Sequence, residues 1–167
     1  SNYGVILSDL GKLKEAELSY RKAIELNPDS AEVYSNLGNI LRGLGNLKEA
    51  ELSYRKAIEL NPDFAEAHSN LGSIVSDLGN LKEAELSTRK AIEIKPDYAN
   101  AHCNLGSILS DLGNLNEAEL STRKAIKIKP DYAEAHGNLG IILRDLGNLK
   151  EAELSTRKAI EIKPDYA

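Results

Sequence analysis

Apolar residues recur along the chain at steps of three and four, the spacing of one face of an α-helix. In residues 65–78 the apolar positions are Ala67, Leu71, Ile74, Val75 and Leu78. A second stripe follows in residues 81–94, at Leu81, Ala84, Thr88, Ala91, Ile92 and Ile94, with Leu86 beside it. No segment alternates apolar and polar residues as a half-buried strand would. The pattern therefore predicts an all-α protein built from pairs of helices.

The helix pair repeats every 34 residues, so the chain aligns with itself after a shift of that length. The copies are a partial one at 1–30 and full ones at 31–64, 65–98, 99–132 and 133–166. We call the first helix of each copy the A helix and the second the B helix. A two-helix unit of this size cannot bury its own apolar stripe, so neighbouring copies must stack into one continuous array over residues 1–167.

Turn and capping residues separate the predicted helices. Gly79 follows the A helix where a left-handed C-terminal cap is expected, and Pro96 lies where the B helix must stop. Asp63 and Asn80 each precede a glutamate by three residues, as in the capping box that satisfies free backbone N–H groups at a helix start. Small residues, such as Gly72 in the A helix and Ala84 in the B helix, would permit close contact between helix axes.

The period, a Leu-Gly pair in the A helix, small residues in the B helix and a closing proline together resemble the tetratricopeptide repeat. In the first full copy these positions are Leu37, Gly38, Ala50, Tyr54, Ala57 and Pro62. The resemblance implies a right-handed superhelical solenoid of antiparallel helix pairs. The sequences of the repeats are most similar to those of O-linked N-acetylglucosamine transferases and bacterial tetratricopeptide-repeat proteins. The pentatricopeptide repeat, which reads RNA, differs in its 35-residue period and basic groove.

Two positions depart from the family pattern after the first full copy. The aromatic residue early in the A helix is Tyr34, replaced later by His68, His102 and His136; the B-helix tyrosines Tyr20 and Tyr54 give way to Thr88, Thr122 and Thr156. We expect looser packing at the threonines. The histidines are interpreted as packing residues, because stacked copies separate them by about 10 Å, too far to share a metal ion. No metal site is predicted.

In the family, A helices line a concave groove that takes extended peptides or partner helices. The matching polar positions, our candidate ligand-binding residues, are Asn36, Asn70, Asn104, Asn138, Asn39, Ser73, Ser107, Arg42, Ser76, Ser110, Arg144, Asp77, Asp111 and Asp145. Ser69 and its counterpart Cys103 are placed on the same face. The four asparagines that recur every 34 residues form a ladder whose carboxamides could clamp a peptide backbone. Alternatively, each asparagine bonds a neighbouring helix.

Charge and composition exclude several classes of function. The formal net charge is −5 with no basic stripe, which disfavours nucleic acid, and no apolar run could cross a membrane. Arg42 and Arg144 lie three copies apart, too far to clamp one carboxylate. Cys103 is the only cysteine, which fits a reducing compartment and hence the cytoplasm. No catalytic constellation and no cofactor motif is found.

We therefore predict a non-enzymatic scaffold that holds a protein or peptide and forms part of a longer protein. One alternative is a module that stacks head to tail with its own copies through an uncovered stripe of the last B helix. The stripe consists of Leu149, Ala152, Thr156, Ala159, Ile160 and Ile162. The other alternative is a substrate-docking arm of an appended enzyme, such as a transferase.

Overall fold

The computed structural model describes residues 12–164, and in this part of the chain helices follow one another without any strand. The predicted part-helix with Asn2, Tyr3, Gly4 and Ile6 lies outside the described residues. The helices are α2 (Leu13–Leu26), α3 (Ala31–Gly43), α4 (Leu47–Leu60), α5 (Ala65–Asp77), α6 (Leu81–Ile94), α7 (Ala99–Asp111), α8 (Leu115–Ile128), α9 (Ala133–Asp145) and α10 (Leu149–Ile162). The predicted all-α architecture is thus confirmed.

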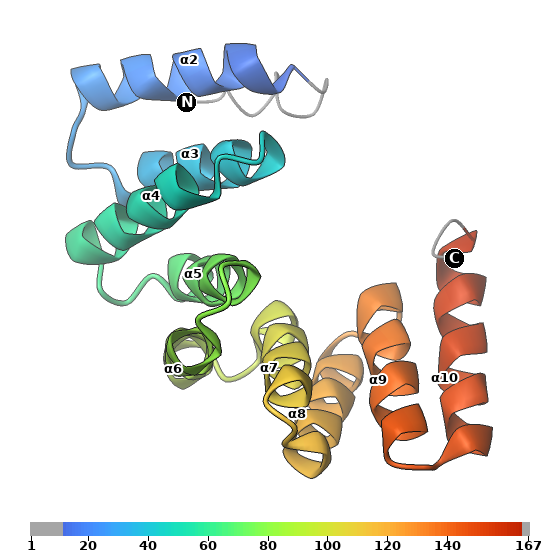
Figure 1. Ribbon diagram of the computed structural model, residues 1–167. Coiled ribbons are helices and arrows are strands. Elements are labelled where there is room, and N and C mark those ends of the chain that lie inside the picture. The colour runs from blue at the N-terminus through green and yellow to red at the C-terminus, as the bar shows by residue number, and fades with distance from the viewer. Residues whose placement is uncertain (1–11, 165–167) are drawn as a thin grey trace.

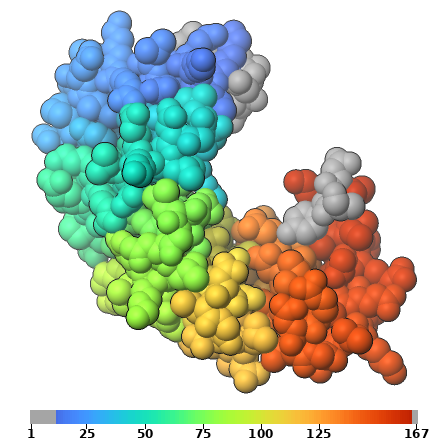
Figure 2. Space-filling model, in the orientation of Figure 1, coloured from blue at the N-terminus to red at the C-terminus, as the bar shows by residue number. Residues whose placement is uncertain are grey.

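The helices pack in chain order and form an open, curved stack (Figure 1). Each A helix (α3, α5, α7, α9) forms a hairpin with the B helix that follows it, and each B helix packs on the next A helix. Successive A helices also contact one another, α3 with α5, α5 with α7 and α7 with α9. The space-filling view shows a hollow on the inner side of the arc (Figure 2). The molecule is a solenoid without a closed central core.

Glycine makes each turn from an A helix to its B helix possible. Gly45, Gly79, Gly113 and Gly147 have φ between 79° and 85°, the left-handed region that costs other residues energy. After Gly79, the N–H of Asn80 donates to the carbonyl of Val75 at 2.8 Å, which satisfies a helix-end acceptor. The predicted glycine cap is confirmed.

Of the two predicted capping residues, one is confirmed and one is wrong. Asn80 accepts from the N–H of Glu83 at 3.5 Å, and its Nδ2 donates to the Glu83 carboxylate at 2.7 Å. Asp63 does not cap the next helix, because α5 begins at Ala65 and Phe64 occupies the N-cap position. The backbone N–H of Asp63 instead donates to Oδ1 of Asn61 at 3.2 Å in the preceding turn.

A glycine of each A helix contacts a larger side chain of its B helix. A Cβ on Gly38 would lie 2.6 Å from the ring of Tyr54, and a Cβ on Gly72 would overlap Oγ1 of Thr88. Thr88 is fully buried, and its hydroxyl donates to the carbonyl of Ala84 at 2.8 Å. The expected loosening at the threonines is therefore wrong, since the helices close around the smaller side chain.

Ion pairs join each B helix to the next on the outer face. Arg55 bonds Glu51 on its own helix at 2.7 Å and Glu83, 28 residues further on, at 2.5 Å. The same step links Arg21 to Glu49, Arg89 to Glu117 and Arg123 to Glu151, at 2.5 to 2.7 Å. Such exposed pairs each contribute only about 0–1 kcal/mol. Because the pairs recur at the same step, successive B helices pack in the same register at each of these four contacts.

The three histidines have structural roles. Nε2–H of His68 donates to the carbonyl of Pro62 at 2.8 Å, and His102 and His136 do the same to Pro96 and Pro130 at 2.9 Å. Each histidine thereby ties the first turn of its A helix to the loop before it. His102 is buried, whereas His68 and His136 are half-buried.

Candidate functional site

Two neighbouring cavities open on the inner face of the stack, and their lining residues come from A helices only. The first has a volume of about 200 Å³ and is lined by Arg42, Ser73, Ser76, Asp77, Asn104, Ser107, Ile108, Asp111 and Glu134. The second, of about 110 Å³, is lined by Ser107, Ser110, Asp111, Asn138, Ile141 and Ile142. Because Ser107 and Asp111 line both, the cavities form one groove across α3, α5, α7 and α9.

The structure brings most of the predicted site residues together in this groove. Nine of the fourteen line a cavity, while Asn36, Asn39, Asn70, Arg144 and Asp145 do not. Two more lining residues, Glu134 and Ile141, occupy positions of the A helix that the sequence pattern places on the groove face, whereas Ile108 and Ile142 belong to the apolar stripe and were missed. Ile141 is the one apolar residue at a position held by Asn39, Ser73 and Ser107 in the other full copies.

Three asparagines of the ladder, Asn70, Asn104 and Asn138, each donate a hydrogen bond to a side chain of the preceding A helix. Nδ2 of Asn104 donates to Oγ of Ser69 at 3.1 Å, and Nδ2 of Asn138 donates to Sγ of Cys103 at 3.4 Å. Asn70 instead donates to Oδ1 of Asn39 at 3.1 Å. The neighbouring helix thus holds the carboxamide in place through Nδ2. Among residues 12–164, the Oδ1 atoms of Asn104 and Asn138 accept no hydrogen bond.

Ser69 and Cys103 were wrongly placed on the groove surface. Both are buried, because their side of the A helix faces the next A helix rather than the solvent. Burial raises the pKa of the Cys103 thiol to about 12, which keeps the group protonated at neutral pH. A buried, protonated thiol is a poor nucleophile.

The charges of the groove are unevenly paired. Arg42 on α3 bonds Asp77 on α5 at 3.2 Å, and Arg144 bonds its neighbour Asp145 at 2.8 Å. Asp111, at the matching position of α7, is exposed and forms no ion pair with any residue that the structure describes.

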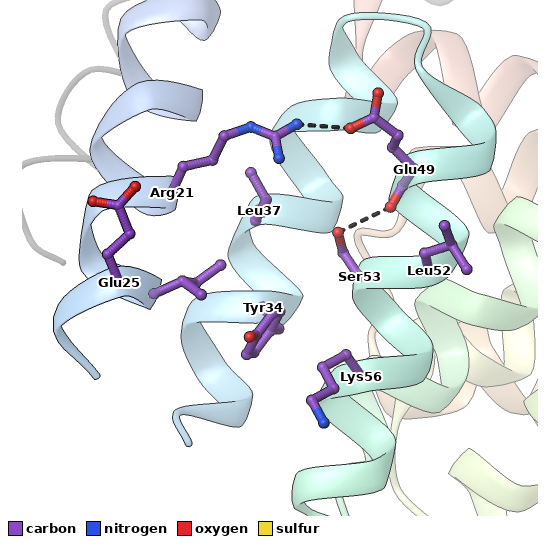
Figure 3. Close-up of a pocket in the computed structure, with 9 residues that line it drawn as sticks. Arg21, Glu25, Tyr34, Leu37, Glu49, Leu52, Ser53 and Lys56 are labelled. Carbon is purple, nitrogen blue, oxygen red and sulfur yellow. Dashed lines mark hydrogen bonds and ion pairs between the residues drawn. The ribbon is translucent and has the colours of Figure 1, made fainter. Parts of the chain in front are cut away.

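A larger cavity, of about 430 Å³, lies at the junction of α2 with α3 and α4 (Figure 3). Its charged rim is internally bonded, since Arg21 pairs with Glu49 across it at 2.7 Å. Leu52, which lines it, is 65% exposed, and the other B helices carry equally exposed leucines at Leu18, Leu86, Leu120 and Leu154. This outer surface holds none of the predicted site residues.

Two further features are absent from the described range. Between residues 12 and 164, no helix is both long and apolar enough to span a bilayer. The same residues contain no group of three or more histidine, cysteine, aspartate or glutamate side chains suited to a metal ion.

A curved stack of helical hairpins with a polar inner groove defines a helical-repeat solenoid. Comparison with protein families identifies the repeat: the family described as Tetratricopeptide repeat matches residues 31–64, 99–132 and 133–166. Further profiles of the same repeat match residues 4–42, 77–113 and 53–85. The chain belongs to the tetratricopeptide repeat family. A comparison with curated proteins gave no match.

Several solved structures share this fold. MamA is 27% identical with a TM-score of 0.79, and the alignment covers 96% of this chain and 94% of MamA. YrrB, described as a TPR protein with an unusual peptide-binding site, is 28% identical with a TM-score of 0.72, covering 99% and 85%. TTC0263 from Thermus thermophilus is 24% identical with a TM-score of 0.86, covering 99% and 90%, a likeness of fold alone.

Proposed function

We propose that the inner groove binds an extended segment of a partner protein and that the chain is a scaffold without catalytic activity. The observation that carries the proposal is the groove itself, whose cavities are lined mainly by polar side chains of α3, α5, α7 and α9. The likeness to YrrB supports it, because that protein is described as having a peptide-binding site. The burial of Cys103 supports the absence of catalysis, since it withdraws the chain's one thiol from solvent.

The asparagines are suited to hold a peptide backbone. The Nδ2 groups of Asn104 and Asn138 bond the neighbouring helix, which leaves the carbonyl oxygen of each side chain to accept a hydrogen bond. A carboxamide can accept from a peptide N–H and donate to a peptide carbonyl. Stacked copies are separated by about 10 Å, and an extended chain rises about 3.3 Å per residue. Successive asparagines would therefore meet every third peptide residue, whatever its side chain.

Replacing Asn70, Asn104 and Asn138 together by alanine is expected to weaken peptide binding at least about tenfold, through the loss of several hydrogen bonds. The probe is a phage-displayed library of random ten-residue peptides, with synthetic copies of the enriched peptides titrated by calorimetry. Circular dichroism of the variant checks that the helices remain.

The matched control is Asn116→Ala, which removes an exposed asparagine of α8 outside the groove. It should leave the affinity unchanged. Equal binding by the triple variant and the parent chain would show that the ladder is purely structural and would refute the groove as the binding site.

A second candidate function is head-to-tail association, and it rests on α10. Leu149 is 65% exposed and Ile160 42% exposed, whereas Ala152 and Ala159 of the same predicted stripe are buried. Arg157 bonds Glu153 at 2.8 Å on its own helix, and the equivalent arginines Arg89 and Arg123 also bond a glutamate of the next B helix. Glu15 on α2 holds that glutamate position and is exposed, so a copy stacked in register would offer it to Arg157.

For this candidate, sedimentation velocity over a hundredfold range of concentration is expected to show association. Arg157→Glu should weaken it, and adding Glu15→Arg should restore it, because the new pair has the opposite polarity. A chain that stays monomeric at the highest concentration would rule the candidate out. The role as a docking arm of an enzyme remains a prediction from the family resemblance.

A further inference from the structure

One groove position is arginine in two of the full copies and serine in the other two, and the residue 35 positions after 42, 76 and 110 is an aspartate. Position 42 is arginine, positions 76 and 110 are serine, and position 144 is arginine. Arg42 reaches Asp77, 35 residues further on, and bonds it at 3.2 Å. The same step from position 76 leads to Asp111, where the cation is missing because Ser76 replaces arginine.

Asp111 is therefore the groove aspartate whose charge has no balancing cation. Both groove arginines pair with other aspartates, Arg42 with Asp77 and Arg144 with Asp145. The residues beside Asp111 in the cavities include neutral serines and Asn104. Glu134, which lines the same cavity, adds a second carboxylate and accepts from the hydroxyl of Tyr132 at 3.5 Å.

We propose that the peptide segment bound in the groove carries a lysine or arginine whose cationic group lies beside Ser76 and pairs with Asp111. This inference rests on the proposed function of the groove. The Arg42–Asp77 pair is the model for this contact, because Arg42 and Asp77 have the same spacing of 35 residues as Ser76 and Asp111. The cavity that contains Asp111 and Ser76 has the room that a side chain needs, about 200 Å³.

The neighbouring cavity selects an apolar side chain. Ile141 is 50% exposed and lies there beside Asn138 and the buried Ile142. At this position the two preceding copies have Ser73 and Ser107, so the apolar contact belongs to this copy. Adjacent subsites separated by about one copy correspond to roughly three residues of extended chain. The bound segment is thus a basic residue with an apolar residue two or three positions away.

Electrostatics favours this choice over an acidic segment. The first cavity contains one arginine against the three carboxylates of Asp77, Asp111 and Glu134, a balance of −2. The chain as a whole has a formal net charge of −5. The negative charge of the cavity and that of the whole chain both attract a cationic segment and accelerate its association at low salt.

The test uses peptides enriched from the random library on the whole chain, each compared with a version whose basic residue is replaced by glutamine. Two variants address the site. Asp111→Asn removes the carboxylate, and Ser76→Arg supplies the chain's own cation, in imitation of the Arg42–Asp77 pair. Each should weaken the basic peptide about tenfold and leave the glutamine version unchanged. Asp131→Asn, at an exposed turn outside the groove, is the matched control of equal charge.

The outcomes separate this inference from the groove itself. If enriched peptides lose binding to the triple asparagine variant but ignore Asp111→Asn and Ser76→Arg, the groove binds peptides and the cation subsite is wrong. Enriched peptides without an excess of basic residues would also overturn the subsite. If no peptide is enriched, or if the asparagine variant binds as well as the parent chain, the proposed function fails and the subsite fails with it.

Discussion

Replacing Gly106 by alanine is expected to destabilise the array by about 1–3 kcal/mol, the usual cost of overpacking a buried contact. The added Cβ would overlap Oγ1 of Thr122 and lie 3.2 Å from the carbonyl oxygen of Ala118. Thr122 is fully buried, and its hydroxyl donates to the same carbonyl at 2.8 Å, so it cannot turn aside without losing a hydrogen bond. Alanine's better helix propensity, worth about 1 kcal/mol, offsets only part of this cost.

Urea denaturation followed by circular dichroism measures the effect. The contact is tested by adding Thr122→Ala, which removes the overlapping hydroxyl and should restore much of the lost stability. Ser107→Ala is the control, because Ser107 is the next residue of α7 and is exposed. A Gly106→Ala chain as stable as the parent would show that the helices can separate freely at this point.

Replacing Tyr54 by alanine is expected to cost about 3–5 kcal/mol, as truncation of a large buried ring usually does. Tyr54 is fully buried between α3 and α4, with its ring against Gly38. Its hydroxyl donates to Oδ1 of Asn39 at 2.8 Å, an acceptor that Asn70 shares. The loss therefore combines a cavity with the removal of a hydrogen bond.

Two milder variants separate the contribution of the ring from that of the hydrogen bond. Tyr54→Phe keeps the ring and should cost about 1 kcal/mol for the hydrogen bond. Tyr54→Thr introduces the residue found at the same place in α6 and α8, where the hydroxyl contacts the A-helix glycine directly. It should cost less than alanine if α3 and α4 can approach each other as those pairs do. A Tyr54→Ala chain that unfolds at the parent's urea concentration would contradict the account.

The helix pairs and the groove face could be predicted from the sequence because they depend on short-range rules. The spacing of apolar residues determines which side of each helix is buried, and glycine and proline mark its ends. Ser69 and Cys103 were misplaced because a solenoid gives each A helix a second buried face, against the next A helix. A small polar residue on that face does not differ in pattern from one in the groove.

The details that separate one copy from another needed the structure. Threonine at the position of Tyr54 in later copies indicated a lost ring, but the direct contact of its hydroxyl with the A-helix glycine depends on how the pair packs as a whole. The unpaired charge of Asp111 depends on a step of 35 residues between A helices, which became visible only in the Arg42–Asp77 bond. Once that step is known, the serine at position 76 is readable from the sequence.

The outer ion pairs have a genetic consequence. Because each described junction joins identical positions, removal of residues 65–98 would place Arg55 opposite Glu117 instead of Glu83, with the bonding pattern unchanged. Unequal recombination between such similar coding segments could therefore shorten or lengthen the array without creating a mismatched junction. Loss of residues 99–132 would put Asp145, which pairs with its neighbour Arg144, in the place of the unpaired Asp111, so one recombination event could alter the length of the groove and the chemistry of its ligand together.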